Sequence, residues 1–404
     1  MEIGPIFRAM LRNKPGYILI ALQIAVTMAI MINAVAIIQE RSSLMARPSG
    51  VDEDNIFYLS SLTFQPEADQ RVMIDADLEA LRSTPGVVDA ISTNSVPLRG
   101  GGWSMGLQVE PGAGIDASGV AIYFTDEHGV DTFGVNLIAG RNFLPEEITW
   151  NDPEVSQWPP VGIITRAMAE TLFPEETPVD VVGRTVYIND DNPVQIVGVM
   201  DRLQAPWSGW DAVERSMLVP EKREWDYNRY VVRTEPGLMD SLMPDIEEML
   251  ASSNRDRIVK DVRTMADTRK RSYLDDAAMV RILTFIVTLL TVITGLGIVG
   301  LASFSVNRRT KQIGTRRALG ATRAAILRYF MVENFVVSTV GVVFGAALAV
   351  GLNIWMVGAF DMAPMAWYLV PVAMLTLWVV GQLAVAGPAR RATRVSPAIA
   401  TRTV

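Results

Sequence analysis

The sequence predicts an α+β membrane protein with four transmembrane helices and a large periplasmic α/β domain between the first and second helices. Three observations lead to this fold class. Four stretches hold about 20 apolar residues each, the length that crosses a bilayer. Basic residues flank these stretches unevenly, which orients them. The first two stretches lie far enough apart in the chain for the intervening segment to form a domain with its own core.

The first predicted span, residues 17–38, holds no charged residue. It is longer than the apolar region of a signal peptide and no small-residue cleavage site follows it, so we interpret it as a retained anchor. The later spans are predicted at residues 282–306, 331–360 and 362–387.

Three basic flanks predict the orientation. Residues 1–16 carry three basic residues and one acidic residue, and residues 388–404 carry four basic residues and no acidic one. Residues 307–330 carry seven basic residues and no acidic one. Because basic flanks stay in the cytoplasm, we expect both termini inside a bacterial inner membrane and residues 39–281 in the periplasm.

Charge and composition exclude several function classes. The whole chain has a net charge of −8 although its cytoplasmic flanks are basic, so the periplasmic segment must be strongly acidic and unsuited to nucleic acid. There is no cysteine and one histidine, and we predict no catalytic residue and no metal site. No Gly-Lys pair occurs, so we expect no phosphate-binding loop and no cofactor in this chain.

The periplasmic segment is predicted to contain two subdomains. Residues 39–98 and 221–266 each follow the order strand–helix–strand, and these two βαβ units are expected to share one sheet. Residues 99–220 would form an inserted β-rich subdomain. Residues 267–281 are polar and favour a helix, which would continue from the second span as a stalk.

Two local patterns in the insert predict particular structural elements. Residues 185–200 contain two alternating apolar runs joined by a polar turn, which predicts a β-hairpin. The stretch TRAMAETLF predicts a short helix with Thr165 as its N-cap.

Glycines in the spans favour close helix packing. Gly295, Gly297 and Gly300 have the spacing of a dinucleotide fingerprint, but they lie in an apolar span with no strand before them. Small residues that let helices approach each other in lipid are the better interpretation. Gly341 and Gly345 form a GxxxG pattern with the same meaning.

The tryptophans and the single histidine of the periplasmic segment each allow two interpretations. Trp207, Trp210 and Trp225 would either contact a periplasmic partner or ligand, or pack in a core. His128 could act as a base with a neighbouring acid, but we expect a surface-loop histidine because no nucleophile accompanies it.

The connection before the third span has more structure than a charge signal needs. Gly314 and Gly320 are expected to break it into short pieces, and Thr322 is expected to cap a following helix. Binding of lipid headgroups would account for the charge of this connection, but not for the glycines that divide it into short pieces.

This connection resembles the cytoplasmic loop of FtsX-like permeases of ATP-binding-cassette (ABC) systems, whose pattern is R-x-x-E-I-G-x-R-R-A-L-G-A-T. Gln312 stands where the family usually has Glu. The C-terminal tail resembles the closing motif of the family, and VGIITRAMAETLF with the hairpin after it resembles the periplasmic domain of the MacB type. The residues expected to dock an ATPase are Arg308, Ile313, Gly314, Arg316, Arg317, Leu319, Gly320, Ala321 and Thr322.

The resemblance implies a permease dimer, built from two copies or from two similar chains, that sits on two copies of a separate ABC ATPase. ATP with Mg²⁺ would bind to that ATPase, and the permease would move its periplasmic domains to export a peptide or an amphipathic compound. A periplasmic adapter, an outer-membrane channel and membrane lipid would be further partners. Lipoprotein release and periplasmic peptide sensing are the alternatives, and a membrane-tethered enzyme is disfavoured.

Overall fold

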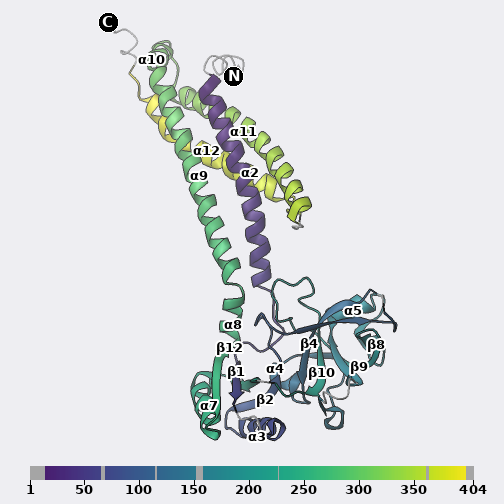
Figure 1. Cartoon of the computed structure of the whole chain (residues 1–404). Coiled ribbons are helices and arrows are strands. Elements are labelled where there is room, and N and C mark those ends of the chain that lie inside the picture. The colour runs from purple at the N-terminus through teal and green to yellow at the C-terminus, as the bar shows by residue number, and fades with distance from the viewer. Residues whose placement is uncertain are drawn as a thin grey trace. The chain divides into compact units, whose positions relative to one another are not determined.

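The chain folds into two compact units (Figure 1). The membrane unit takes the residues up to 45 and from 276 onward, and the core domain takes residues 46–275. The predicted N-terminal flank and the end of the predicted tail lie almost entirely outside the described residues. The computed structural model describes residues 14–64, 69–113, 116–151, 158–225, 227–360 and 364–396.

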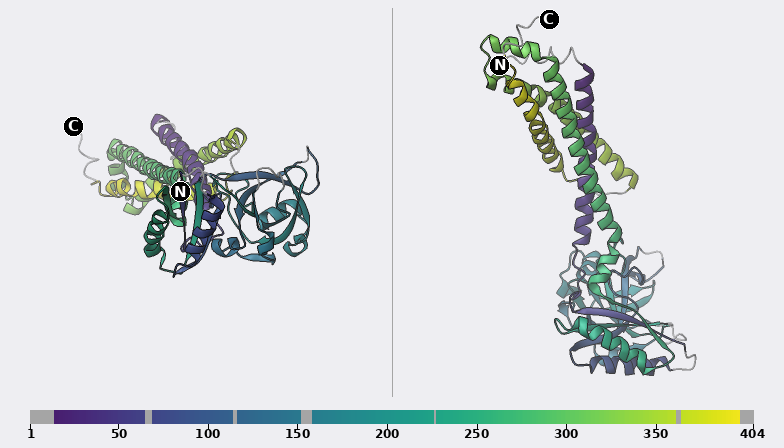
Figure 2. Two further views of the ribbon diagram at one scale, coloured as in Figure 1. Left: turned by 60° about the horizontal axis from the view of Figure 1, so that its bottom comes forward. Right: turned by 90° about the vertical axis from the view of Figure 1, so that its left-hand side faces the viewer.

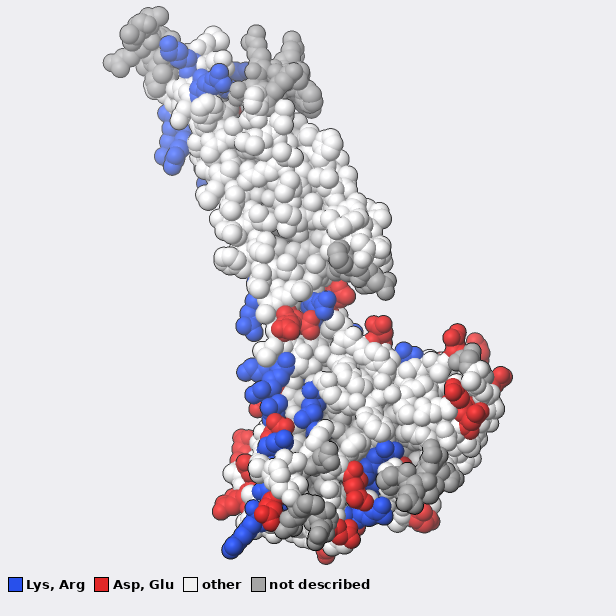
Figure 3. All heavy atoms as spheres, in the orientation of Figure 1, with Lys and Arg blue, Asp and Glu red and all other residues white. Residues whose placement is uncertain are grey.

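Four helices of the membrane unit are long and apolar enough to cross a membrane. They are α2 (Lys14–Met45), α9 (Leu274–Arg308), α11 (Arg323–Phe360) and α12 (Leu369–Thr393). With 32 residues and a rise of about 1.5 Å per residue, α2 exceeds the roughly 30 Å of a bilayer hydrocarbon core. In Figure 3 the middle of this unit shows no charged residue on the face in view, as a lipid-facing surface requires.

The long helices do not begin and end at the bounds of the predicted spans, and α2, α9 and α11 extend beyond those bounds. The fourth long helix begins at Leu369 rather than 362 and continues to Thr393. Arg390 and Arg391 lie in its last turn, where their positive charge interacts favourably with the negative end of the helix dipole. The predicted stalk is not one helix, because α8 (Met265–Ser272) ends at Tyr273 before α9 starts.

Glycines of α11 allow a close approach to α2. A Cβ atom added to Gly341 would lie 2.8 Å from the carbonyl oxygen of Ala21. One added to Gly345 would lie 2.8 Å from the Cβ of Met28. A larger residue at either position would therefore force the two helices apart.

The glycines of α9 are placed differently. Gly297 faces the side chain of Gln23, and Gly295 has only Val380 within 4 Å of an added Cβ, at 3.8 Å. A Cβ atom added to Gly300 would have no atom of another helix within 4 Å in the described chain. Only 11% of the most apolar window of α9 is buried, against 56% for α2. Most of α9 therefore remains available to lipid or to another chain.

The first subdomain of the core domain is a four-stranded antiparallel sheet covered by helices on one face (Figure 2). Its elements are β1 (Ile56–Thr63), α3 (Gln70–Arg82), β2 (Val87–Thr93), β11 (Tyr227–Thr234), α7 (Met239–Ser253) and β12 (Arg257–Thr264). The strand order β12–β1–β11–β2 interleaves the two βαβ units in one sheet, as the sequence predicts. Helices α3 and α7 pack around Phe57 and Tyr230, and the opposite face presents Tyr58 and Val231 to the inserted subdomain.

The inserted subdomain is a mixed sheet that closes on itself. Its strands are β3 (Trp103–Gln108), β4 (Ser118–Thr125), β5 (Leu137–Gly140), β6 (Thr149–Trp150), β7 (Val161–Thr165), β8 (Thr185–Ile188), β9 (Asn192–Met200) and β10 (Ser216–Lys222). Short helices connect them: α4 (Gly129–Phe133), a 3₁₀ turn (Pro145–Glu147), α5 (Arg166–Leu172) and α6 (Pro178–Val181). The path β4–β3–β8–β9–β7–β10 closes because β10 also pairs with β4 in parallel. The insert is thus a small barrel, a closure that the β-rich pattern does not predict.

Strand β4 contributes to two cores. Val120, Ile122 and Phe124 join the core of the barrel. Ala121 and Tyr123 point to the opposite side and join the core shared with the first subdomain. This alternation follows from the two-residue period of a strand and attaches the two subdomains to each other through apolar packing.

Two local predictions for the insert are confirmed. Strands β8 and β9 pair as an antiparallel hairpin, and the turn residues Asn189 and Asp190 have φ angles of 50° and 71°. Asn and Asp tolerate this left-handed region, which tight hairpin turns require. Thr165 caps α5, since its side-chain oxygen accepts a hydrogen bond from the backbone N–H of Met168.

Candidate functional site

The basic connection 308–330 is largely helical. After α9 it forms α10 (Thr310–Ala318), a short turn, and the first two turns of α11. Gly320 has a φ of 95° and ends α10, and Thr322 caps α11 by accepting a hydrogen bond from the N–H of Ala325 at 3.2 Å. The prediction that Gly314 breaks the segment is wrong, because this residue lies inside α10 and is buried.

The predicted docking residues divide between two sides of α10. Ile313 is 6% exposed and packs with Ile326, Phe330 and Ala389, which fixes α10 to α11 and α12. Arg317 donates to the backbone carbonyl of Thr393 at 2.5 Å. These inward contacts hold the segment in place, so a second protein would meet the outward side.

The outward side combines positive charge with an exposed apolar side chain. Leu319 is 83% exposed and stands at the tip of the turn. In Figure 3, Lys and Arg side chains gather at the end of the membrane unit that carries α10. The remaining predicted docking residues with an exposed or partly exposed position are Arg308, Arg316, Gly320, Ala321 and Thr322.

A groove of about 220 Å³ lies between α10 and α11. Ile313 and Ala325 form part of its apolar floor, and Arg316 lies at its rim with its guanidinium 5.0 Å from the ring centre of Tyr329. Such a groove accepts an apolar side chain with an acidic neighbour, which is the chemistry of a protein interface.

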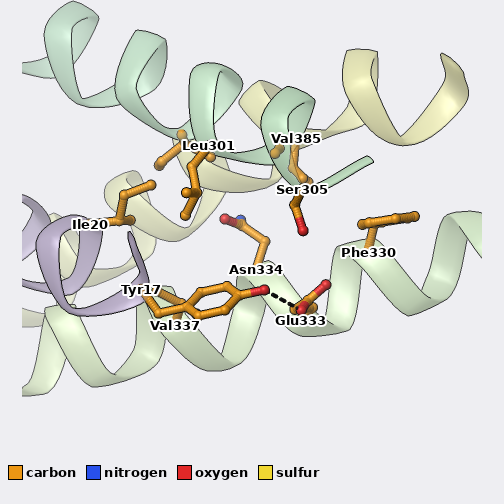
Figure 4. Close-up of a pocket in the computed structure, with 11 residues that line it drawn as sticks. Tyr17, Ile20, Leu301, Ser305, Phe330, Glu333, Asn334, Val337 and Val385 are labelled. Atoms are coloured by element: carbon orange, nitrogen blue, oxygen red, sulfur yellow. Dashed lines mark hydrogen bonds between the residues drawn. The ribbon is translucent and has the colours of Figure 1, made fainter. Parts of the chain in front are cut away.

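A buried polar contact lies beneath this segment (Figure 4). Arg309 donates to the carboxylate of Glu333 at 2.9 Å and to the hydroxyl oxygen of Tyr17 at 3.1 Å. The Tyr17 hydroxyl donates to the same carboxylate at 2.5 Å. The Glu333 side chain is 5% exposed. These three residues connect the start of α10, α11 and α2, and we call them the polar junction.

Electrostatics favour the charged form of the junction arginine. Burial alone would lower the pKa of Arg309, but the carboxylate of Glu333 beside it holds that pKa above its ordinary value. A charged pair at this depth is stable only when both partners remain. Sequence reasoning missed this contact, since it counted the basic residues of 307–330 only for orientation and placed Glu333 within a predicted span without assigning it a role. The available signal was an acidic residue inside a long apolar helix.

The predicted aromatic cluster does not form one site. Trp207 and Trp210 pack edge to face with ring centres 5.5 Å apart and border the core shared by the subdomains. Trp225 packs instead on Trp103, with ring centres 5.7 Å apart, next to the core of the barrel. Each tryptophan therefore has packing partners of its own, whatever else it contacts.

His128 lies in the loop before α4, as expected, but its side chain has a polar partner that the sequence does not indicate. His128 stands before α4, half-buried, with its Nδ1 atom 2.9 Å from the carboxylate of Asp89. Arg82 approaches the same carboxylate at 3.4 Å. The histidine thus contributes to a polar cluster between strand β2 and the barrel. Among the described residues, no group of three His, Cys, Asp or Glu side chains is arranged to hold a metal ion.

Two family models match the chain in line with these two units. The model described as MacB-like periplasmic core domain matches residues 17–249, which is more than half of the chain. The model described as FtsX-like permease C-terminal matches residues 284–397. The chain belongs to the MacB- and FtsX-like family of ABC transporter permeases. The permease therefore carries a periplasmic core domain between its first and second long helices, and the segment with α10 lies within the FtsX-like part.

Individual relatives are distant from the permease. It is 28% identical to the ABC transporter permease YknZ of Bacillus subtilis over 259 residues, which make up 60% of this chain and 61% of YknZ. It is 27% identical to the macrolide export ATP-binding/permease protein MacB of Sodalis glossinidius over 344 residues, 81% of this chain and 48% of MacB. The chain thus spans less than two thirds of the length of these curated relatives.

A solved structure of a relative resembles part of the chain. The periplasmic region of MacB from Actinobacillus actinomycetemcomitans is 14% identical, with a TM-score of 0.34 over 57% of this chain and 97% of that region.

Proposed function

We propose that the permease couples ATP hydrolysis by an ABC ATPase to a movement of its core domain in the periplasm, and that this movement drives export. The observation that carries the proposal is the segment 308–330 of an FtsX-like permease, fixed on its inner side and apolar and basic on its outer side. The ATPase would bind the outer side, and ATP with Mg²⁺ would bind to the ATPase.

The polar junction would transmit the movement of the docked segment. A shift of α10 displaces Arg309, which is hydrogen-bonded to α11 through Glu333 and to α2 through Tyr17. Helices α2 and α9 lead directly into the two ends of the core domain along the chain. A displacement of these helices would therefore reach the periplasm without any movement of substrate through the membrane.

The permease would work as a dimer. The lightly covered α9 supports this proposal, because its apolar surface and its Gly300 have few neighbours within the described chain. A second copy, or a similar permease, would cover that surface through close helix packing.

The exported compound would be a peptide or an amphipathic molecule. Support comes from the MacB relatives, whose names describe macrolide export. An adapter protein and an outer-membrane channel would complete the export path in an organism with two membranes.

The orientation can be tested with single cysteines, because the chain has none of its own. Ala324→Cys at the start of α11 and Glu170→Cys on α5 are both exposed. In intact cells a membrane-impermeant maleimide should label position 170 and leave position 324 unlabelled until the cells are permeabilised. The reverse pattern would refute a periplasmic core domain.

Coupling can be tested by distance measurement in nanodiscs. A spin label at Glu170→Cys in both copies should report one distance for the permease with its ATPase, and a different one after ATP and vanadate are added. Without the ATPase, ATP should change nothing. If the distance stays constant while the bound ATPase turns over, the core domain does not respond to ATP and the proposal fails.

A further inference from the structure

Two cavities of the core domain meet at one arginine. A cavity of about 360 Å³ is lined by Tyr58, Arg99, Trp207, Arg263 and Arg271 among others. A second cavity, of about 150 Å³, is also lined by Arg99. Its aromatic walls are Trp103, Trp225 and Tyr227. Together they have the size and the mixed apolar and polar lining of a site for a small ligand.

The positive charges at the larger cavity exceed the negative charge that the described residues provide. Asp261 is the acidic partner of both Arg99 and Arg263, at 3.6 Å and 3.4 Å. It can neutralise only one of them. Arg271 makes no ion pair within the described residues. An anion in the cavity would therefore meet at least two uncompensated guanidinium groups.

A buried arginine lies next to these residues. Arg229 stands on β11, opposite Ser60 of β1 and Thr93 of β2, so its side chain shares a sheet face with both. It is 1% exposed and donates through Nη1 to the backbone carbonyl of Asn94. Its Nε and Nη2 atoms, and the hydroxyl of Ser60, have no hydrogen-bond partner in the described chain.

Burial of such a group without a carboxylate is costly. A buried charge loses hydration, and this loss is normally offset by an opposite charge nearby. Burial first, and then the charge of Arg99 nearby, lower the pKa of Arg229. An anion bound at Arg99 would offset the repulsion between the two guanidinium groups.

We propose that the core domain binds a small amphipathic carboxylate here, with its carboxylate on Arg99 and the flanking Arg263 and Arg271. Its apolar part would lie against Trp207 in the larger cavity or against Trp103 and Trp225 in the smaller one. A guanidinium matches a carboxylate with two parallel hydrogen bonds, and tryptophan offers a flat apolar surface. The proposal concerns binding alone and does not depend on transport.

The test uses a matched pair of ligands on the full chain in nanodiscs. N-acetyl-tryptophan carries the carboxylate, and N-acetyl-tryptophan amide has the same ring without the charge. Isothermal titration should give at least tenfold tighter binding of the acid. Equal affinity for the two compounds would refute a carboxylate site. Inorganic phosphate should compete weakly, and competition as strong as that of the acid would refute the aromatic part of the site.

One variant and its matched control locate the site. Arg99→Gln should weaken binding of the acid about tenfold and leave the weak binding of the amide unchanged. Arg184→Gln is the control, since it removes an arginine from an exposed ion pair with Glu176 on the barrel, and binding should remain normal. Normal binding by Arg99→Gln would exclude the proposed site.

Arg229→Met separates a binding role from a structural one. Replacing a buried charge that has no carboxylate partner by an apolar side chain of similar length should raise the thermal unfolding temperature of the ligand-free permease. It should also weaken binding of the acid. A lower unfolding temperature with unchanged binding would show that Arg229 serves the fold alone and would refute its part in the site.

Discussion

Leu319→Asp is expected to prevent stable binding of the ABC ATPase while the permease still inserts and folds. The side chain is 83% exposed, so its replacement disturbs no core of the described chain. Loss of a central apolar contact in an interface typically costs about 2 kcal/mol or more, a drop in affinity of over tenfold. Co-purification of the ATPase in detergent at fixed ionic strength measures the effect.

The matched control for this prediction is Lys311→Gln. Lys311 is exposed on α10, and its removal lowers the basic charge by one without touching the turn. If the segment only orients the helices, neither variant should affect ATPase binding. If it docks the ATPase, Leu319→Asp should lose binding and Lys311→Gln should keep nearly all of it. Normal ATPase binding by Leu319→Asp would show that the segment only orients the helices in the membrane.

A bulky substitution at Gly320 would give a less clear answer. Its φ of 95° is unfavourable for any residue with a Cβ, so Gly320→Trp would strain the turn as well as change the surface. A loss of ATPase binding in that variant could come from either cause. Leu319, whose backbone has an ordinary negative φ of −83°, isolates the surface effect.

Local features of this fold were predictable from the sequence because local rules determine them. The caps at Thr165 and Thr322 follow from a hydroxyl before a helix, and the hairpin turn at Asn189 follows from residues that tolerate positive φ. Pairing between strands that are distant in the sequence could not be predicted in this way. The barrel closes through β4 and β10, nearly a hundred residues apart, and no short pattern encodes that register.

In the candidate site, too, local features were predictable from the sequence and contacts between distant residues were not. The segment around Leu319 was found through a motif, but the motif could not tell which residues face inward. Gly314 illustrates this, since it reads as a helix breaker and is instead a buried position within α10. The polar junction joins Tyr17 to residues 292 and 316 positions away, and only the packing of α2 on α11 brings them together.

Glu333→Leu is expected to cost the permease about 3–5 kcal/mol of stability, because it leaves Arg309 buried without its carboxylate. The thermal unfolding temperature in detergent should fall clearly. Tyr17→Phe is the milder control, since it removes a neutral hydroxyl and should cost about 1 kcal/mol. Equal stability of Glu333→Leu and the natural chain would show that the Arg309–Glu333 pair is hydrated and contributes little to the free energy of unfolding.

Removal of both charges separates stability from coupling. Arg309→Met combined with Glu333→Leu leaves no buried charge in the junction, so most of the lost stability should return. The outer side of the docking segment is unchanged in this double variant, and the ATPase should still bind and hydrolyse ATP. The link from α10 to α2 and α11 would be gone, however. The spin-label distance in the core domain should then no longer respond to ATP and vanadate. A normal response would mean that apolar packing alone, through Ile313 and its neighbours, transmits the movement.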